Sequence, residues 1–383
     1  MEAPKVGPRH TGEYDWVRVI RHEYVHTVTL SRTKNRIAHW FTEAAAVHLE
    51  GGPRDYDSAA LLARAVRDGS LFDMRQINIA FVRPEKPSDR GQAYAQGHWM
   101  YEFIVEQWGE QAPLDMMDLY AGGAREDEAM RSVLGVSREE FFERFKPWAR
   151  EQARSWGMLP EPSMASLTAS WAAQDPAWLL KAHATMRGAA FAFASLSSGG
   201  AAANPARLSL PRPTLGVVQT WLLAHPEHPD LLEAVLQHEL AQTGGEPTQD
   251  MVELLTRYAA ARPVDPLPHR HLARLRLASD DPSSAIPHLE YLDVREQKSA
   301  AYAIELSRRY AAIQDLDRAD AKALRATQIA PFNASYREFA ARVALLRKDY
   351  AAAERHIAAL TELEPDRPEH AQRLERVRAM TPR

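Results

Sequence analysis

The string His22-Glu23-Tyr24-Val25-His26 places two imidazoles four residues apart. Residues at that spacing share one face of a helix, so His22 and His26 can offer two nitrogen atoms to a single cation. Glu23 lies one position round the helix, within reach of a water molecule bound to the same cation. The spacing therefore predicts a metal site with a carboxylate beside it.

Glu43 is the candidate for a third ligand. It lies on the next predicted helix and shares a face with Trp40 and Val47, where a carboxylate is costly unless a cation compensates it. Catalytic zinc usually keeps three protein ligands and one open position, so this set predicts Zn²⁺ with a water molecule in the fourth place. Alternatively, Glu43 only interacts favourably with the dipole at the start of its helix.

Helices are expected to position these residues. The first covers 15–30 and has an apolar stripe that consists of Val17, Ile20, Tyr24 and Val28. The stripe lies opposite the two histidines, so the histidines are expected to face a cleft instead of the core. The second covers 39–50 and ends at Gly51-Gly52-Pro53. Further helices are predicted over 58–68, 92–108, 114–120 and 137–156, the last opening with the capping box Ser137-x-x-Glu140.

The last third of the chain repeats with a period of 34 residues. Matching positions carry small residues, aspartates, alanines and prolines in one register: Ala273, Ser307 and Ala341; Asp281, Asp315 and Asp349; Ala285, Ala319 and Ala353; Pro263, Pro331 and Pro365. This period is typical of tetratricopeptide repeats, in which small residues let paired helices approach closely. Gln297 departs from the pattern, a degenerate unit is expected over 230–263, and a capping helix over 366–380. Any other α-solenoid is the alternative.

These patterns predict three segments. A helical domain with the predicted metal site covers 1–159, a partly helical connector with a flexible stretch at 195–204 covers 160–213, and tetratricopeptide-like repeats cover 214–383. The fold class expected is mainly α.

Composition narrows the function. The formal net charge of −4 argues against nucleic-acid binding, and the absence of a long apolar run predicts no membrane span. Without cysteine, any metal must be held by His, Asp or Glu. The start of the chain lacks the apolar core of a secretory signal, and composition leaves the bacterial envelope and the cytoplasm equally open.

The segment His22–Gly51 resembles the gluzincin clan of metallopeptidases, which includes thermolysin and aminopeptidase N. It is most similar to bacterial peptidase-MA-like proteins with tetratricopeptide repeats, whose Trp-Phe-x-Glu-Gly segment is matched by Trp40-Phe41-Thr42-Glu43-Ala44, with Ala in place of Gly. The resemblance implies that His22, His26 and Glu43 bind zinc and that Glu23 is the catalytic base. It also implies an upstream β-sheet lobe, which we expect to be missing from this chain.

Tyr94, in Ala93-Tyr94-Ala95-Gln96-Gly97, resembles the aminopeptidase tyrosine that hydrogen-bonds the oxyanion of the tetrahedral intermediate. Alternatively, it belongs to a core stripe with His98, Tyr101, Val105 and Trp108. We expect His98 to be packed in that core. His39 could support Glu43 from outside the metal shell, although a solvated histidine is the more ordinary interpretation.

The function expected is zinc-dependent peptide-bond hydrolysis by a metal-activated water, with Glu23 as general base. The substrate would be a peptide or protein, and the repeats would bind the substrate or a protein partner. One alternative is a catalytically weak or inactive zinc-binding scaffold for protein–protein interaction. Another is a structural zinc site, which would usually have a fourth protein ligand. The sequence leaves exopeptidase and endopeptidase action open.

Overall fold

The structure is a computed structural model that describes residues 13–174 and 213–380. Within these ranges the regular secondary structure is entirely helical, which confirms the mainly α fold class. The chain divides into one compact unit, Met1–Ala153 with Val264–Arg383, and a second, Arg154–Pro263. No helix in the described ranges combines the length and apolar character that crossing a membrane requires. The flexible stretch predicted at 195–204 lies outside the described residues.

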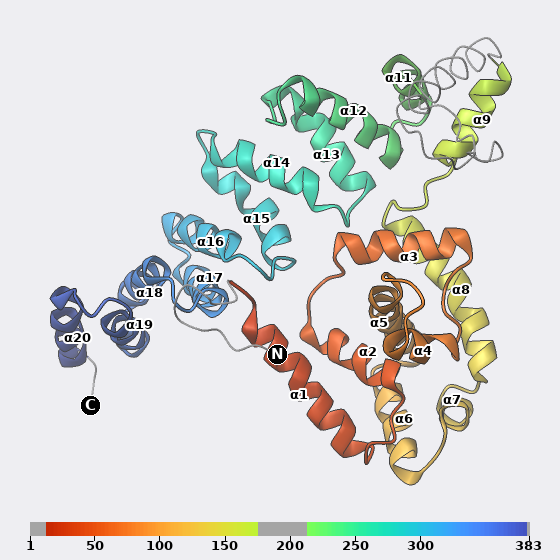
Figure 1. The fold of residues 1–383 in the computed structure, drawn as a ribbon. Helices are drawn as coiled ribbons and strands as arrows, with labels where there is room; N and C mark the ends of the chain where they lie inside the picture. Colours follow the sequence, from red (N-terminus) through yellow and green to blue (C-terminus); the bar gives the residue numbers. More distant parts are fainter. Residues whose placement is uncertain (1–12, 175–212, 381–383) are drawn as a thin grey trace, which may run out of the picture. The chain divides into compact units, whose positions relative to one another are not determined.

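The first unit begins with the helices that carry the predicted metal site (Figure 1). In chain order these are α1 (Trp16–Arg32), α2 (His39–Glu50), α3 (Tyr56–Asp68), α4 (Gln76–Val82), α5 (Asp89–Trp108), α6 (Gln111–Gly122), α7 (Glu126–Val133) and α8 (Arg138–Ser155). Sequence periodicity does not reveal α4 and α7, because about two turns give too little of a repeat to recognise. The predicted capping box at the start of α8 is present, since Ser137 and Glu140 exchange hydrogen bonds of 3.1 and 2.8 Å.

Helix α2 lies at the centre of this group and packs against α1, α4 and α5. Every residue from Trp40 to Ala46 is buried, and a helix that is buried all round belongs to a core. Helix α5 passes close to α2 at Gly97, where a Cβ would make only an ordinary 3.5 Å contact with the Trp40 carbonyl oxygen. This packing carries Glu43 into the interior of the domain.

Helix α1 packs on α2 through the face that carries its two histidines, Val25 and Thr29. The apolar stripe on the opposite face is exposed, with exposed fractions from 39% at Val17 to 66% at Tyr24. The expectation that this stripe faces the core is therefore wrong. The histidine face is turned inward instead, where it makes hydrogen bonds to Glu50 and Thr42 of α2.

The repeats also belong to the first unit. Their helices are α14 (Pro266–Leu277), the 3₁₀ turn η3 (Pro282–Ala285), α15 (Ile286–Asp293), α16 (Ala301–Ala312), α17 (Leu316–Ile329), α18 (Ala334–Leu346), α19 (Tyr350–Leu363) and the capping helix α20 (Pro368–Met380). Consecutive helices pack in pairs, as in a tetratricopeptide-like α-solenoid.

The 34-residue register has a clear structural meaning. The three aspartates cap the second helical element of each pair; Asp281, Asp315 and Asp349 accept hydrogen bonds from the backbone amides of Ser283, Arg318 and Ala352. The matching alanines are fully buried where the helices cross; they are Ala285, Ala319 and Ala353. Pro331 and Pro365 follow the ends of α17 and α19 by two residues, while Gln297 lies in the longer turn between α15 and α16.

The second unit contains α9 (Met164–Gln174), α11 (Leu215–Ala224), α12 (Pro229–Gln242), the 3₁₀ turn η2 (Gln249–Met251) and α13 (Val252–Ala261). One apolar cluster in this unit consists of Leu167, Val218, Trp221 and Leu231. Helices α12 and α13 pack together in the stretch where a degenerate repeat is expected, and the buried Arg262 pairs with Asp230 and Glu233 of α12.

Candidate metal centre

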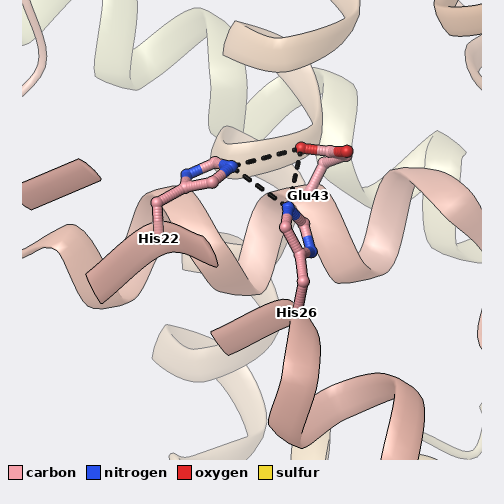
Figure 2. Close-up of side chains that lie close together, drawn as sticks. All are labelled: His22, His26 and Glu43. Carbon is pink, nitrogen blue, oxygen red and sulfur yellow. Dashed lines mark hydrogen bonds and ion pairs between the residues drawn. The ribbon is translucent and has the colours of Figure 1, made fainter. Parts of the chain in front are cut away.

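Three potential ligand atoms converge between α1 and α2 (Figure 2). The Nε2 atoms of His22 and His26 are 3.1 Å apart. Oε2 of Glu43 lies 3.5 Å from the first nitrogen and 3.4 Å from the second. The two imidazoles come from successive turns of one helix, and the carboxylate comes from the helix beside it. These are the three residues that the sequence predicts as ligands.

The triangle has the size that a small tetrahedral cation requires. Zinc bonds of about 2.0–2.1 Å at tetrahedral angles separate the ligand atoms by about 3.3–3.4 Å. The observed separations of 3.1, 3.4 and 3.5 Å bracket that value. Two imidazole nitrogens and one carboxylate oxygen are also a donor set that zinc accepts. The residues present therefore fit the metal.

The Glu43 carboxylate has an unsatisfied atom that points to the same conclusion. Its Oε2 is buried and has no hydrogen-bond partner in the described part of the chain. Burial raises the pKa of Glu43, but the neighbouring His22, His26 and His39 outweigh it and hold the pKa below its usual range. In the metal-free protein the protonated His22 balances this buried charge, and a bound cation would take its place.

A second carboxylate orients His22 from behind. Nδ1 of His22 lies 2.7 Å from Oε1 of Glu50, in the last turn of α2, and Glu50 in turn accepts a 3.1 Å hydrogen bond from Nε of Arg18. Such a partner fixes the ring so that Nε2 faces the site. Gly52 leaves room for this pair, since a Cβ there would overlap the Arg18 guanidinium at 1.3 Å.

His26 has a partner of its own. Its Nδ1 lies 3.0 Å from Oγ1 of Thr42, which also lies 2.7 Å from Oγ1 of Thr29. Both threonines are buried. Each imidazole thus has one nitrogen toward Glu43 and the other held by a neighbouring side chain, so both rings are fixed before any metal binds.

Arg18, Thr42 and Glu50 are not predicted from the sequence. A signal for Glu50 exists: it follows Glu43 by seven residues, which places both carboxylates on one face of α2. Thr42 gives no such signal, because its contact with His26 depends on the crossing of α1 over α2.

The carboxylates on either side of His22 change its protonation. Contacts with Glu43 and then Glu50 raise the pKa of His22 to about 9, against the opposing effect of burial. In the metal-free protein this imidazole therefore binds a proton at neutral pH. A metal ion must displace that proton, so metal binding competes with protons at this site.

The proposed catalytic groups lie around the triangle. Glu23 is exposed to solvent, next to His22 on α1. Tyr94 is 36% exposed, the most exposed member of the stripe in which it was considered as a core residue. Burial, followed by the charge of Glu43, raises the pKa of Tyr94, and Glu23 contributes in the same direction. The phenol is therefore neutral at ordinary pH and close to both carboxylates.

His39 and His98 lie in different surroundings. His39 is half exposed, and its Nε2 lies 3.6 Å from Oε1 of Glu43, the oxygen that does not face the triangle. Its ring contacts Phe81, which in turn contacts Tyr94. His98 is buried away from the triangle near His48, and burial lowers its pKa to about 3, as expected of a packed histidine.

Comparison with known proteins adds the family. Residues 9–151 match the family model of the peptidase MA superfamily. This segment is a peptidase MA superfamily domain. The domain contains the whole His22, His26 and Glu43 cluster. Membership implies a metallopeptidase acting on proteins or peptides, and it implies zinc as the metal.

A chain of the solved structure "Crystal structure of APC/C hetero-tetramer Cut9-Hcn1" is similar at a TM-score of 0.29 and 15% identity. The match covers 93% of this chain and 58% of that one, so the present chain spans less than two thirds of its length. The sequence has no significant match among curated proteins.

Proposed function

We propose that the chain is a zinc-dependent peptidase of the gluzincin type, with His22, His26 and Glu43 as the metal ligands. The convergence of two imidazole nitrogens and one buried carboxylate oxygen on a single point carries the proposal. A bound zinc ion would supply a Lewis acid that lowers the pKa of water and polarises a carbonyl group.

The protein residues supply the proton transfers and the positioning. Glu23, an exposed carboxylate beside His22, takes a proton from the attacking water and delivers it to the leaving amine. Tyr94, kept neutral by its raised pKa, donates a hydrogen bond to the oxyanion that develops on the substrate carbonyl. Glu50 and Thr42 hold the two imidazoles in orientation throughout.

A structural zinc site is the weaker candidate. Structural zinc usually takes four protein ligands. In the described ranges, no fourth His, Cys, Asp or Glu joins the group formed by His22, His26 and Glu43. The side chains of the two histidines are 17% and 18% exposed, so solvent can reach a fourth position. Both features favour a catalytic metal.

The repeats are proposed to bind the protein substrate or a partner along the α-solenoid, as such arrays commonly do. The remaining alternative is a zinc-binding scaffold that no longer cleaves peptides. The cleavage assay described below distinguishes this scaffold from a peptidase.

The test is cleavage of a peptide library by the zinc-loaded full chain, with and without a chelator, beside Glu23→Gln. We expect chelator-sensitive cleavage, and in the variant a loss of about 10²–10⁴-fold with unchanged zinc content. Glu143→Gln, at an exposed glutamate of α8, is the control and should match the wild type. Zinc binding without cleavage by the wild type would favour the scaffold, and full activity in Glu23→Gln would refute the assigned base.

A further inference from the structure

The start of α1 lies beside α17 of the repeats (Figure 1). The backbone amide of Tyr14 donates to the carbonyl of Ile329 at 3.1 Å, and that of Asp15 donates to the carbonyl of Gln297 at 2.7 Å. The carboxylate of Glu13 accepts a 2.7 Å hydrogen bond from the amide of Ala300. Three successive residues ahead of the helix are thus bonded to the array.

The centre of this joint is a buried cluster of charges around Arg325 of α17. Its guanidinium donates to Oδ2 of Asp15 at 2.5 Å and to Oδ1 of Asp293 at 3.0 Å. It also donates to the carbonyls of Asp293 and Glu296, both at 2.9 Å. Asp15 is 4% exposed and Asp293 1%, so neither carboxylate can replace this partner with bulk water. Removing one member of such a cluster is costly.

Asp15 connects the cluster to the metal helix. It is the N-cap of α1, and its Oδ1 accepts a 3.2 Å hydrogen bond from the backbone amide of Arg18. The Arg18 side chain bonds Glu50, which orients His22. A continuous series of contacts therefore leads from α17 to the first imidazole of the metal centre.

The joint borders an open hollow of about 290 Å³, lined by Asp15, Arg18, Glu50, Asp293, Lys322 and Arg325 among others. Val17, the nearest member of the exposed stripe of α1, is 39% exposed. Trp16, in the first turn, is half-buried and contacts Tyr14, so this end of the helix has both polar and aromatic contacts. The opposite end is held within the peptidase MA domain, where Arg32 donates to both oxygens of Asp118 at 2.8 and 2.9 Å.

We infer that the repeat array is a structural part of the metal centre, with Arg325 as the residue through which it positions α1 and, with it, His22. The consequence for the metal rests on the proposed function, whereas the anchoring of α1 does not. The array thus has a positioning role besides any role in binding partners.

The experiment compares amide hydrogen exchange in the metal-free full chain of the wild type, Arg325→Gln and Arg347→Gln. Arg347 is the matched control, because its side chain is similarly exposed (28% against 23%) and also bridges two aspartates, Asp317 and Asp320, but only within the array. Asp15→Asn is a second test variant. Asparagine caps a helix as well as aspartate does, so this change removes the charge on Arg325's partner and keeps the cap.

We expect Arg325→Gln and Asp15→Asn to speed exchange in the first two turns of α1 by about tenfold or more, with α18–α20 unchanged. Arg347→Gln should leave α1 as in the wild type. Equal exchange of α1 in the wild type and both test variants would overturn the inference.

Zinc titration gives the functional readout. Arg325→Gln should weaken zinc binding by about threefold to tenfold, less than the about 10–100-fold expected when a direct partner of a ligand is removed. Arg347→Gln should bind as the wild type does. Equal zinc affinity in Arg325→Gln and Arg347→Gln would refute the link to the metal centre. A wild type that binds no zinc would instead contradict the proposed function, while hydrogen exchange would still decide the anchoring.

Discussion

Nδ1 of His22 lies 2.7 Å from Oε1 of Glu50, while Nε2 of the same ring faces Oε2 of Glu43 at 3.5 Å. The imidazole therefore stands between two carboxylates that belong to one face of α2. Because Nδ1 is bonded to Glu50, Nε2 is the nitrogen available to a metal.

Loss of Glu50 should weaken the metal site without removing a ligand. We expect Glu50→Ala to lower zinc affinity by about 10–100-fold, because His22 loses the acceptor that fixes its ring. Competition with a chromophoric chelator measures the change. Glu143→Ala, at an exposed glutamate, should bind zinc as the wild type does, and an unchanged affinity in Glu50→Ala would contradict the role assigned to Glu50.

A substitution at Gly52 should weaken zinc binding because it displaces Arg18. In Gly52→Ala the new methyl group would overlap the Arg18 guanidinium, a flexible group that can move away, so the cost is loss of its bond to Glu50 and not misfolding. Zinc affinity should fall several-fold, while the free energy of unfolding should change by about 1 kcal/mol or less. The control is Gly122→Ala, where the added methyl group meets open space. A Gly52→Ala protein with wild-type zinc affinity would separate Arg18 from the metal site.

Tyr94 should affect turnover and not metal binding. Removing a donor to an oxyanion costs about 10²–10³-fold in kcat, so Tyr94→Phe should lose activity on that scale with its zinc content unchanged. The phenyl ring keeps the contact with Phe81, which makes this a conservative change. Wild-type kcat in Tyr94→Phe would restore the alternative that Tyr94 is only a packed residue.

The metal-free protein should lose stability as the pH rises from neutral. The pKa of His22 is raised from 6.5 to about 9, so the folded state binds this proton more tightly than the unfolded state. The resulting contribution to stability is complete below pH 6.5 and disappears as the pH rises through about 9. Thermal unfolding in a chelator should show this loss in the wild type and not in His22→Gln. Parallel curves for the two proteins would contradict it.

The same proton should oppose zinc. Because the ion must displace it, apparent zinc affinity should fall about tenfold for each pH unit below the pKa of His22. Zinc titrations across this range in Glu50→Ala should show a weaker dependence, since one of the two carboxylates that raise the pKa is gone.

Local patterns predicted most of this fold because they reflect contacts within one helix or one repeat. The bounds of α2 follow from its apolar run and from Gly51, which takes the left-handed conformation at its end. The aspartates of the 34-residue register are helix caps in the structure. His22 and His26 share a face by spacing alone.

The missed features depend on how helices cross. Thr42 reaches His26 only because α1 lies over α2. The stripe of α1 that includes Ile20 and Tyr24 has the pattern of a core face, yet it is exposed, because the polar face of α1 makes the contacts with α2. The ion pair between Arg325 and Asp15 links positions 310 residues apart, and a local sequence pattern cannot predict such a contact.

Anomalous diffraction at the zinc edge, from crystals of the zinc-loaded full chain, would locate the metal among its ligands. We expect one strong peak between α1 and α2, about 2.0–2.2 Å from Nε2 of His22, Nε2 of His26 and an oxygen of Glu43, with no fourth protein ligand. A peak elsewhere, or coordination that leaves out Glu43, would contradict the proposed metal site.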